Sequence, residues 1–521
     1  MLDLPELLEK VFQHLDRHDL TQCAQVNKQW HALTIPHIWR DLTCVRPGDT
    51  TGKAFGKVVL EDYLQEKKHE EGPSQPSVLS KYGHLIRLLP SPIDLGRAFR
   101  SQVRTQQGNE PTAYDLLFHL FKYSSKAQVQ SLRYNYKDPE KDKMKSVLAF
   151  TLPRLRSFYI ETFCLEGTQS EFFKFKSLLD QCSTTLQKLD LHINVLGARE
   201  PVDMTDEATE NESICWTSLK DLTLRHTADP WDAGSLWSWM WKRCGQVERL
   251  HVRKIDQSTP SLVQAMSAYM HNLREIVIGD YIVSDQGVHT EDAMEDDVVA
   301  ALLSGSLRGW KSVSVLSNAK FGRETMNALV LHYSALEELN VDGNTHLPSS
   351  DLVQVLRSCP HLHTLTYTHT TEGISLSDGE TFVDLDPDTG ILKPWRCEGS
   401  LKVLDIKITG IPRPDLESES VVAEAYPGQG REIQSQVYER LGRLTHLKTL
   451  WLGDHLGAFQ RDCLEMSLES GLDKLSGLKS LKKLSVGKMA TKIGIQEIRW
   501  MVENWPKLSV LYGFDLGVLK P

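Results

Sequence analysis

The sequence predicts an α/β fold in which a curved parallel β-sheet carries helices on its outer side, and a small three-helix module precedes this repeat solenoid. Three observations support the solenoid. A six-residue apolar pattern, LxxLxL or a close variant, recurs along most of the chain. Its tightest copies are 26 residues apart, for example from residue 336 to residue 362, and repeats of this length contribute one strand each. Apolar stripes with helical spacing lie between the copies.

The first predicted element is a helical module over residues 1–44. Asp3 is placed to cap a first helix, with Glu6 three residues later to complete the capping box. Asp19 is placed to cap a second helix, and a third is centred on Trp30. The first helix has an apolar stripe, and the second bears Leu20, Cys23, Ala24 and Val26.

This module resembles the F-box. The shared features are an LPELL opening, the VFQHL step, a DL pair, the VNKQW segment and a closing IW pair. Asn27 stands where many members have Cys, and Ile38 where many have Leu. In that family the segment docks on the Skp-type adaptor of a cullin–RING ubiquitin ligase. The resemblance implies that the adaptor-binding residues are Leu4, Pro5, Leu8, Val11, Phe12, Leu15, Leu20, Val26, Trp30, Ile38 and Trp39.

The size of the module is consistent with docking. About 40 residues rarely bury enough apolar surface to fold alone, and so many large apolar side chains in a short segment favour a partner surface. The alternative is that the module only covers the end of the solenoid, since terminal repeats need a cap. Docking is favoured, and the two roles are compatible.

Residues 45–83 are polar and interrupted by proline and glycine, so we expect a linker with one short helix near residues 58–60. The repeat array is expected over residues 84–521, with about twelve strands. Segments such as LRSCPHLHTLTY (356–367) and LEELNVDGNTHL (336–347) resemble the leucine-rich repeats of fungal-type F-box proteins. A leucine-rich-repeat solenoid is therefore the predicted fold.

The residues between strands predict helices that pack on the sheet. One example is the face formed by Leu352, Val355, Leu356 and Cys359. Further faces are Leu262/Met266/Tyr269/Met270, Met326/Leu329/Val330/Tyr333 and Ile495/Ile498/Met501/Val502. Such stripes indicate core packing and not a cofactor site.

Four stretches lengthen individual repeats, and we expect them to emerge on one edge of the solenoid. They carry 22 acidic and only 5 basic residues, whereas the whole chain has a net charge of −10. The stretches are residues 195–214, 281–298, 371–396 and 411–431. This concentration of acid indicates a solvated edge that is able to steer a basic partner.

Basic residues gather at outward strand positions instead. Arg225 is followed one repeat later by Arg249, His251 and Arg253, and stacked strands lie only about 4.8 Å apart. We therefore expect a target-binding cluster suited to carboxylates or phosphates. The alternative is ordinary surface, with the charges relieved by Asp190 and Asp221. Trp451 is a second candidate target-binding residue, because outward aromatic residues often anchor interfaces.

Several functions are disfavoured by the sequence. The negative net charge argues against nucleic acid as a partner. No signal peptide or apolar span is visible, and the nine cysteines form no CxxC pair, so we expect an intracellular protein, cytoplasmic or nuclear, that does not bind membranes. The segment from Asp384 to Gly390 resembles a calcium loop, but its glycine comes one place late and Trp395 replaces the final Glu. Neither a metal nor a cofactor nor a catalytic motif is expected.

The sequence thus favours a non-catalytic subunit of a ubiquitin ligase. The F-box-like module would bind a Skp-family adaptor, and through it a cullin scaffold, while the repeats would bind an unidentified target protein. The alternative is a leucine-rich-repeat scaffold that binds a partner outside any ligase. Co-purification of the adaptor discriminates between the two.

Overall fold

The structure is a computed structural model of the whole chain. It describes residues 5–15, 17–40, 58–64, 78–82, 119–120, 131–134, 156–164, 176, 179–194, 215–226, 239–253, 259–279, 294–316, 319–342, 347–367, 377–411, 429–453, 463–487, 489 and 493–513. The chain divides into two compact units, Met1–Val247 and Glu248–Pro521. Each unit is described separately below.

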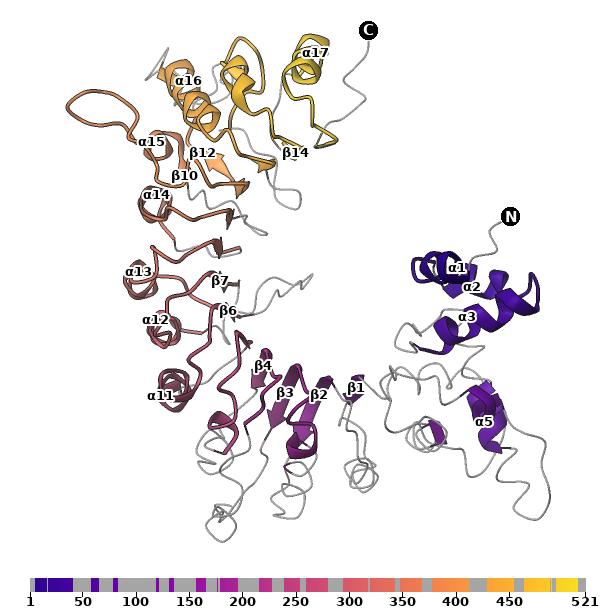
Figure 1. Cartoon of the computed structure of the whole chain (residues 1–521). Helices are drawn as coiled ribbons and strands as arrows, with labels where there is room; N and C mark the ends of the chain where they lie inside the picture. The colour runs from indigo at the N-terminus through magenta and orange to yellow at the C-terminus, as the bar shows by residue number, and fades with distance from the viewer. Residues whose placement is uncertain are drawn as a thin grey trace, which may run out of the picture. The chain divides into compact units, whose positions relative to one another are not determined.

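The first unit begins with the predicted three-helix module, formed by α1 (Pro5–Phe12), α2 (Arg17–Cys23) and α3 (Lys28–Arg40) (Figure 1). Leu8, Phe12 and Leu20 form its core, and the ring of Phe12 packs edge-on against Trp30 with centroids 5.5 Å apart. Asn27 caps α3 by accepting the amide of Trp30 at 2.8 Å. The module is therefore held together by a small apolar core.

The next residues were expected to form a linker, but their described part is packed. Residues 58–64 and α5 (Val78–Tyr82) are helical, and Val59 and Leu79 are fully buried. Trp39 of α3 stacks on Tyr82 with centroids 5.7 Å apart. The sequence favoured a linker because polar residues dominate this segment, yet each of these short helices buries an apolar side chain.

Four parallel strands follow in the first unit. They are β1 (Ser131–Tyr134), β2 (Ser157–Cys164), β3 (Lys188–Asn194) and β4 (Asp221–His226), paired in sequence order. The central apolar positions of the repeats are aligned, with Phe158 opposite Leu189 and Leu189 opposite Leu222. Leu189 and Leu222 are buried, which confirms the predicted register.

The second unit continues the same arrangement with parallel strands in sequence order (Figure 1). They are β5 (Arg249–Val252), β6 (Glu275–Ile278), β7 (Ser312–Val315), β8 (Glu338–Asn340), β9 (Thr364–Tyr367), β11 (Val403–Ile406), β13 (Thr449–Trp451), β14 (Lys483–Ser485) and β15 (Val510–Tyr512). A separate pair is formed by β10 (Ser377–Asp378) and β12 (Ile408–Thr409). In each main strand the second residue belongs to one aligned apolar row, for example Leu365, Leu404 and Leu450.

Helices cover the sheet of the second unit on one side, as Figure 1 shows for α11 to α14. The helices are α11 (Thr259–Tyr269), α12 (Asp296–Ser304), α13 (Arg323–Val330), α14 (Ser349–Ser358), α15 (Gly379–Val383), α16 (Gln429–Gly442), the 3-10 helix η5 (Leu472–Gly477) and α17 (Ile495–Asn504). The predicted face of α14 is buried at Leu352, Val355 and Leu356. The α/β solenoid is thus confirmed in both of its layers.

Three of the predicted helix faces reach the surface at their margins, the first of them at Tyr269 at the end of α11. Val330 at the end of α13 is exposed. In α17, Met501 is buried but Ile495 and Val502 are exposed, because this is the last helix described in the array. Helical spacing therefore identified the helices correctly but overestimated the width of their buried faces.

The prediction that all four acidic stretches are edge insertions is wrong for residues 377–396. This segment contains β10 and α15, and it packs between α14 and α16 through the contacts described below. Residues 296–298 similarly begin α12. The rest of the four stretches lies outside the described residues, apart from residues 294–295, 411 and 429–431. Acidic composition alone did not distinguish a loop from a short helix with an acidic start.

Candidate functional site

The residues predicted to bind an adaptor fall into three groups in the N-terminal module. Leu8, Phe12, Leu20 and Trp39 are buried within the first unit itself. Leu15, Trp30 and Ile38 are partly buried against the module core. Val11 and Val26 are exposed, at 51% and 60% of their surface. Leu4 and the side chain of Pro5 lie outside the description.

The buried residues stabilise the module, and the exposed residues are accessible to a partner. Leu8 and Phe12 lie one helical turn apart on α1 and point into the core, whereas Val11 on the same helix faces outward. Each of these two exposed valines leaves apolar surface that a partner is able to cover. The core residues shape that surface, and Val11 and Val26 are free to touch a partner directly.

The four basic candidates for target binding are divided between the units. Arg225 belongs to β4 of the first unit, where its backbone is opposite His192. Arg249 and His251 belong to β5 of the second unit, and Arg253 follows that strand. The ring N–H of His251 donates to the carbonyl of Gly279 at 3.0 Å, so part of the predicted cluster also stabilises the neighbouring repeat.

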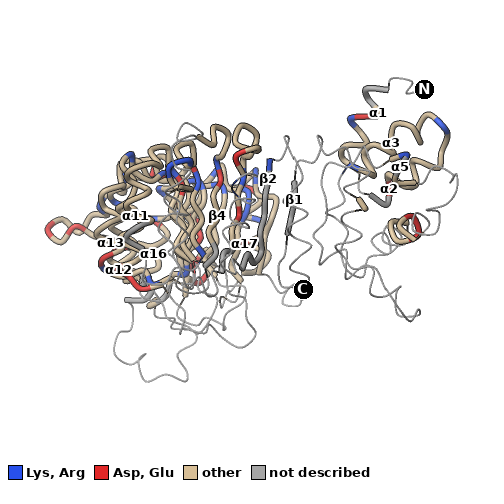
Figure 2. Tube along the Cα trace, turned by 90° about the horizontal axis from the view of Figure 1, so that it is seen from below, with Lys and Arg blue, Asp and Glu red and all other residues tan. Residues whose placement is uncertain are grey.

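The basic candidates were expected to be neutralised by Asp190 and Asp221, but the ion pairs differ in part. Arg249 pairs with Glu275, with Nε and Oε2 2.5 Å apart, and Asp221 pairs with Lys188 at 3.2 Å. Glu275 is opposite Arg249 in the register and 26 residues later in the chain. The same repeat spacing joins Lys311 to Glu337 at 2.5 Å. Both pairs join residues 26 apart, so the repeat length predicts them. Figure 2 shows basic and acidic residues interspersed along the array.

Trp451, the aromatic candidate, is the last residue of β13 and is partly buried. It is opposite Ser485 of β14, which is opposite Tyr512 of β15. The rings of Trp451 and Tyr512 meet edge-on, with centroids 6.4 Å apart, and Tyr512 is 48% exposed. An aromatic face therefore crosses the last three strands.

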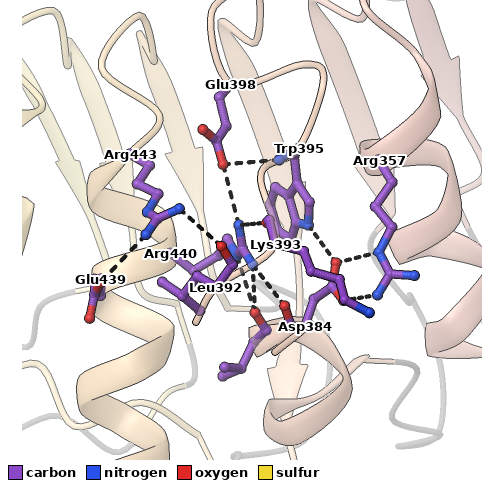
Figure 3. Close-up of polar contacts among 10 residues, drawn as sticks. Arg357, Asp384, Leu392, Lys393, Trp395, Glu398, Glu439, Arg440 and Arg443 are labelled. Carbon is purple, nitrogen blue, oxygen red and sulfur yellow. Dashed lines mark hydrogen bonds and ion pairs between the residues drawn. The ribbon is translucent and has the colours of Figure 1, made fainter. Parts of the chain in front are cut away.

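A buried polar network that no sequence pattern indicated is centred on Arg440 of α16 (Figure 3). The Arg440 side chain is completely buried. Its guanidinium donates to the carbonyls of Val383 at 2.7 Å and Lys393 at 2.6 Å, and to a carboxylate oxygen of Glu398 at 3.3 Å. It also lies 4.5 Å from the ring centroid of Trp395. Burial lowers the pKa of Arg440 to about 10 while Glu398 raises it, so the group stays charged at neutral pH.

The segment that resembles a calcium loop has a structural use in this network. Asp384 is buried, forms an ion pair with Arg357 of α14, and accepts the indole N–H of Trp395 at 3.3 Å. Asp386 accepts the amides of Asp388 and Thr389, both at 3.0 Å. These acceptor roles, together with Trp395 in the place of the final ligand, do not fit a calcium loop.

Several cysteines of the repeats are buried. Cys182, Cys244 and Cys359 are fully buried, and burial raises the pKa of the Cys182 and Cys359 thiols to about 12. These thiols are therefore protonated at neutral pH and unreactive as nucleophiles. Within the described residues there is no cluster of three or more His, Cys, Asp or Glu that would hold a metal ion. Nor does this part of the chain contain a helix long and apolar enough to span a membrane.

Comparison with known proteins places the N-terminal module in a family. Residues 2–45 match the family model described as F-box-like. No curated protein sequence matches the chain. Among solved structures, the chain is similar to one from the crystal structure of the Rad7 and Elc1 complex in yeast, with 13% identity, a TM-score of 0.36 and 90% of each chain covered. It is also similar to an LRR protein of Leptospira interrogans, with 15% identity, a TM-score of 0.22, and 73% of this chain and 100% of that chain covered.

Both TM-scores are low, so the repeat assignment rests on the chain's own pattern. That pattern is one LxxLxL copy per parallel strand, with the copies in register and helices between them. The chain therefore carries an F-box-like domain at its N-terminus, followed by leucine-rich repeats.

Proposed function

We propose that the protein is the substrate-recognition subunit of an SCF-type (cullin–RING) ubiquitin ligase. The F-box-like domain would bind a Skp-family adaptor, and through it a cullin scaffold, and the repeats would bind a target protein for ubiquitination. The family match over residues 2–45 carries this proposal. The protein would itself be non-catalytic, contributing proximity while other subunits perform the covalent chemistry.

The geometry of the module supports adaptor docking. Its buried core is small, and Val11 and Val26 remain exposed at its surface. Covering such side chains on association removes apolar surface from water, at roughly 25 cal/mol per Å². Target binding would use residues of the strands and their ends, and the candidates are Arg225 in the first unit and Arg249, His251, Arg253 and Trp451 in the second.

Adaptor binding is tested with the full chain and a purified Skp-family adaptor. We expect Val11→Asp and Val26→Asp to weaken binding by about tenfold or more, because each places a charge on a surface that docking would dehydrate. Glu9→Gln, at an exposed position on the same helix, is the matched control and should bind normally. Far-UV circular dichroism should show that all three variants keep their helices.

Leu8→Asp and Phe12→Asp provide a second comparison. Both residues lie in the module core, so these variants should lose adaptor binding together with the helices of the module. If the surface variants Val11→Asp and Val26→Asp both bind the adaptor normally, docking through this face is refuted. If the unmodified chain does not bind the adaptor at all, the repeat scaffold acting outside a ligase becomes the better assignment.

A further inference from the structure

The residues that immediately precede the strands of the second unit form a continuous row. From Arg274 onward, each backbone amide in this row donates to the carbonyl of the residue one repeat earlier, at 2.7 to 2.9 Å. The members in order are Glu248, Arg274, Lys311, Glu337, His363, Lys402, Lys448, Lys482 and Ser509. Neighbouring members are therefore separated by one strand spacing, about 4.8 Å. We call this the strand-start row.

Charge is neutralised in the first half of the row. Lys311 pairs with Glu337 at 2.5 Å. In the adjacent outward position, Arg249 pairs with Glu275 at 2.5 Å, and Ser312 donates to Glu338 at 3.3 Å. These are cross-strand pairs of the kind that stabilise a sheet, so charge in this half serves the fold.

The second half of the row contains three lysines in succession. Lys402, Lys448 and Lys482 follow one another on three neighbouring strands, and Lys483 is the next residue of the last one. Lys448, Lys482 and Lys483 are exposed and Lys402 is partly buried. Within the described part of the chain, none of these four lysines forms an ion pair. We call them the lysine row.

Acidic residues are scarce around the lysine row. Among the main-sheet strands β9, β11, β13, β14 and β15 the only carboxylate is Asp405, which is 8% exposed. Adjacent like charges repel, and the repulsion weakens when an anion binds between them. The aromatic face of Trp451 and Tyr512 lies on the same strands, β13 and β15. These aromatic residues end their strands, three residues beyond the strand-start row. A basic row at the start of strands that end in an aromatic pair suits a ligand with anionic groups and an apolar side chain.

We propose that the lysine row binds an acidic peptide segment of the target protein, with the Trp451–Tyr512 face accepting an apolar residue of that segment. This inference rests on the proposed function, since it names the chemistry of the target. Three neighbouring strands span roughly 10 Å, which is the length of about three extended peptide residues. The net charge of −10 disfavours a long polyanion such as nucleic acid, but a short acidic segment contacts only the local row.

The test uses the full chain and a fluorescein-labelled, glutamate-rich peptide that contains one leucine, with binding followed by fluorescence anisotropy. Counterparts carry glutamine or phosphoserine in place of glutamate. We expect the glutamate and phosphoserine peptides to bind more tightly than the glutamine peptide, and added salt to weaken them. The triple variant Lys402→Gln/Lys448→Gln/Lys482→Gln should bind about tenfold more weakly, since each exposed charge pair contributes a few-fold.

The matched control removes three positive charges elsewhere in the same unit, as Arg274→Gln/Lys311→Gln/Lys320→Gln. Two of these residues are paired with acidic side chains, Lys311 with Glu337 and Lys320 with Glu295. The control should bind within about twofold of the unmodified chain. Exchange of the three row lysines for arginine should preserve binding, because the charge is kept.

Three results would overturn the proposal: unchanged binding by the lysine-row variant, equal weakening by the control, or tighter binding of single-stranded DNA than of peptide at the same lysines. Adaptor binding is measured in parallel. If the adaptor binds but the lysine-row variant binds the peptide as tightly as the unmodified chain, only the lysine-row proposal is refuted. Absence of adaptor binding with intact peptide binding removes the ligase assignment and leaves the row as a scaffold's binding surface.

Discussion

Replacing Arg440 with methionine removes a buried guanidinium while keeping much of its apolar stem. The carbonyls of Val383 and Lys393 then lose their donor from α16, and Glu398 loses its cationic partner. Asp384 keeps a donor for its carbonyl, because the amide of Lys393 bonds to it at 3.0 Å. Leaving a buried acceptor without a donor costs about 1–3 kcal/mol, and breaking a buried pair costs about 3–5 kcal/mol. We therefore expect a loss of about 3–5 kcal/mol of local stability.

Native-state hydrogen exchange is the suitable assay, because a chain of two units need not unfold in one step. The reporters are the amides of Asp386, Gly390 and Lys393, which are hydrogen-bonded at 2.8 to 3.0 Å in the segment that Arg440 holds at Val383 and Lys393. A loss of about 3 kcal/mol corresponds to roughly 100-fold faster exchange. Amides of the distant strands β6 to β8 should exchange at the unmodified rate.

Arg443 provides the matched control for this experiment. It lies one residue beyond the end of α16, is one-third exposed, and donates to the carbonyl of Leu392 at 3.3 Å. Arg443→Met should cost less than about 1 kcal/mol, as is usual for partly exposed ion pairs. Arg440→Lys should fall between the two, since lysine keeps the charge but not the planar fork. If Arg440→Met and Arg443→Met accelerated exchange equally, the proposed stabilising role of the buried Arg440 network would be refuted.

Two further predictions concern contacts between successive repeats. Asp296 of α12 accepts the amides of Gly322, Glu324 and Thr325 at the start of α13, so Asp296→Ala should destabilise the second unit by about 1–3 kcal/mol in urea melts, and the exposed Asp297→Ala by much less. Burial opposes ionisation of Asp296, but its bonds with Thr325, Glu324 and Gly322 prevail and lower its pKa. The cap therefore stabilises the second unit fully at neutral pH, and this stabilisation is lost as the pH falls through the lowered pKa of Asp296. If the Asp296→Ala variant lost stability in acid as steeply as the unmodified chain, this role would be contradicted. Burial also lowers the pKa of His332, whose ring donates to the carbonyl of Leu303 at 3.0 Å. Because the unfolded chain then takes up the proton first, stability should fall as pH drops below about 6.5, and a His332→Gln variant that showed the same fall would argue against it.

The features that repeat with a fixed period were predictable from the sequence. The buried leucines recur at each strand because the same position faces the core in every repeat, and their register follows. The pairs Arg249–Glu275 and Lys311–Glu337 join residues 26 apart, so the same period contains them. By contrast, Arg440 contacts residues 57, 47 and 42 positions away. No period predicts those separations, because the repeats between them differ in length.

The N-terminal module shows a different limit. An apolar stripe identifies the inward side of a helix only when one side is buried, and a docking module has a core and a contact surface that are both apolar. Leu8, Val11 and Phe12 therefore look alike in sequence, although only Leu8 and Phe12 are buried. Packing against neighbouring helices decides between these positions, and that information is not local to α1.

Charge along the strand-start row connects the fold with the proposed recognition. A solenoid brings equivalent residues of successive repeats to one strand spacing, so every charge at such a position meets its counterpart in the next repeat. Opposite signs then stabilise the sheet, as Lys311 and Glu337 do. Identical signs, as at Lys402, Lys448 and Lys482, reduce stability slightly and concentrate positive potential. The repeats from β5 to β8 pair opposite charges, so a run of positive charge is not needed to form the sheet. We therefore explain the lysine row by ligand binding.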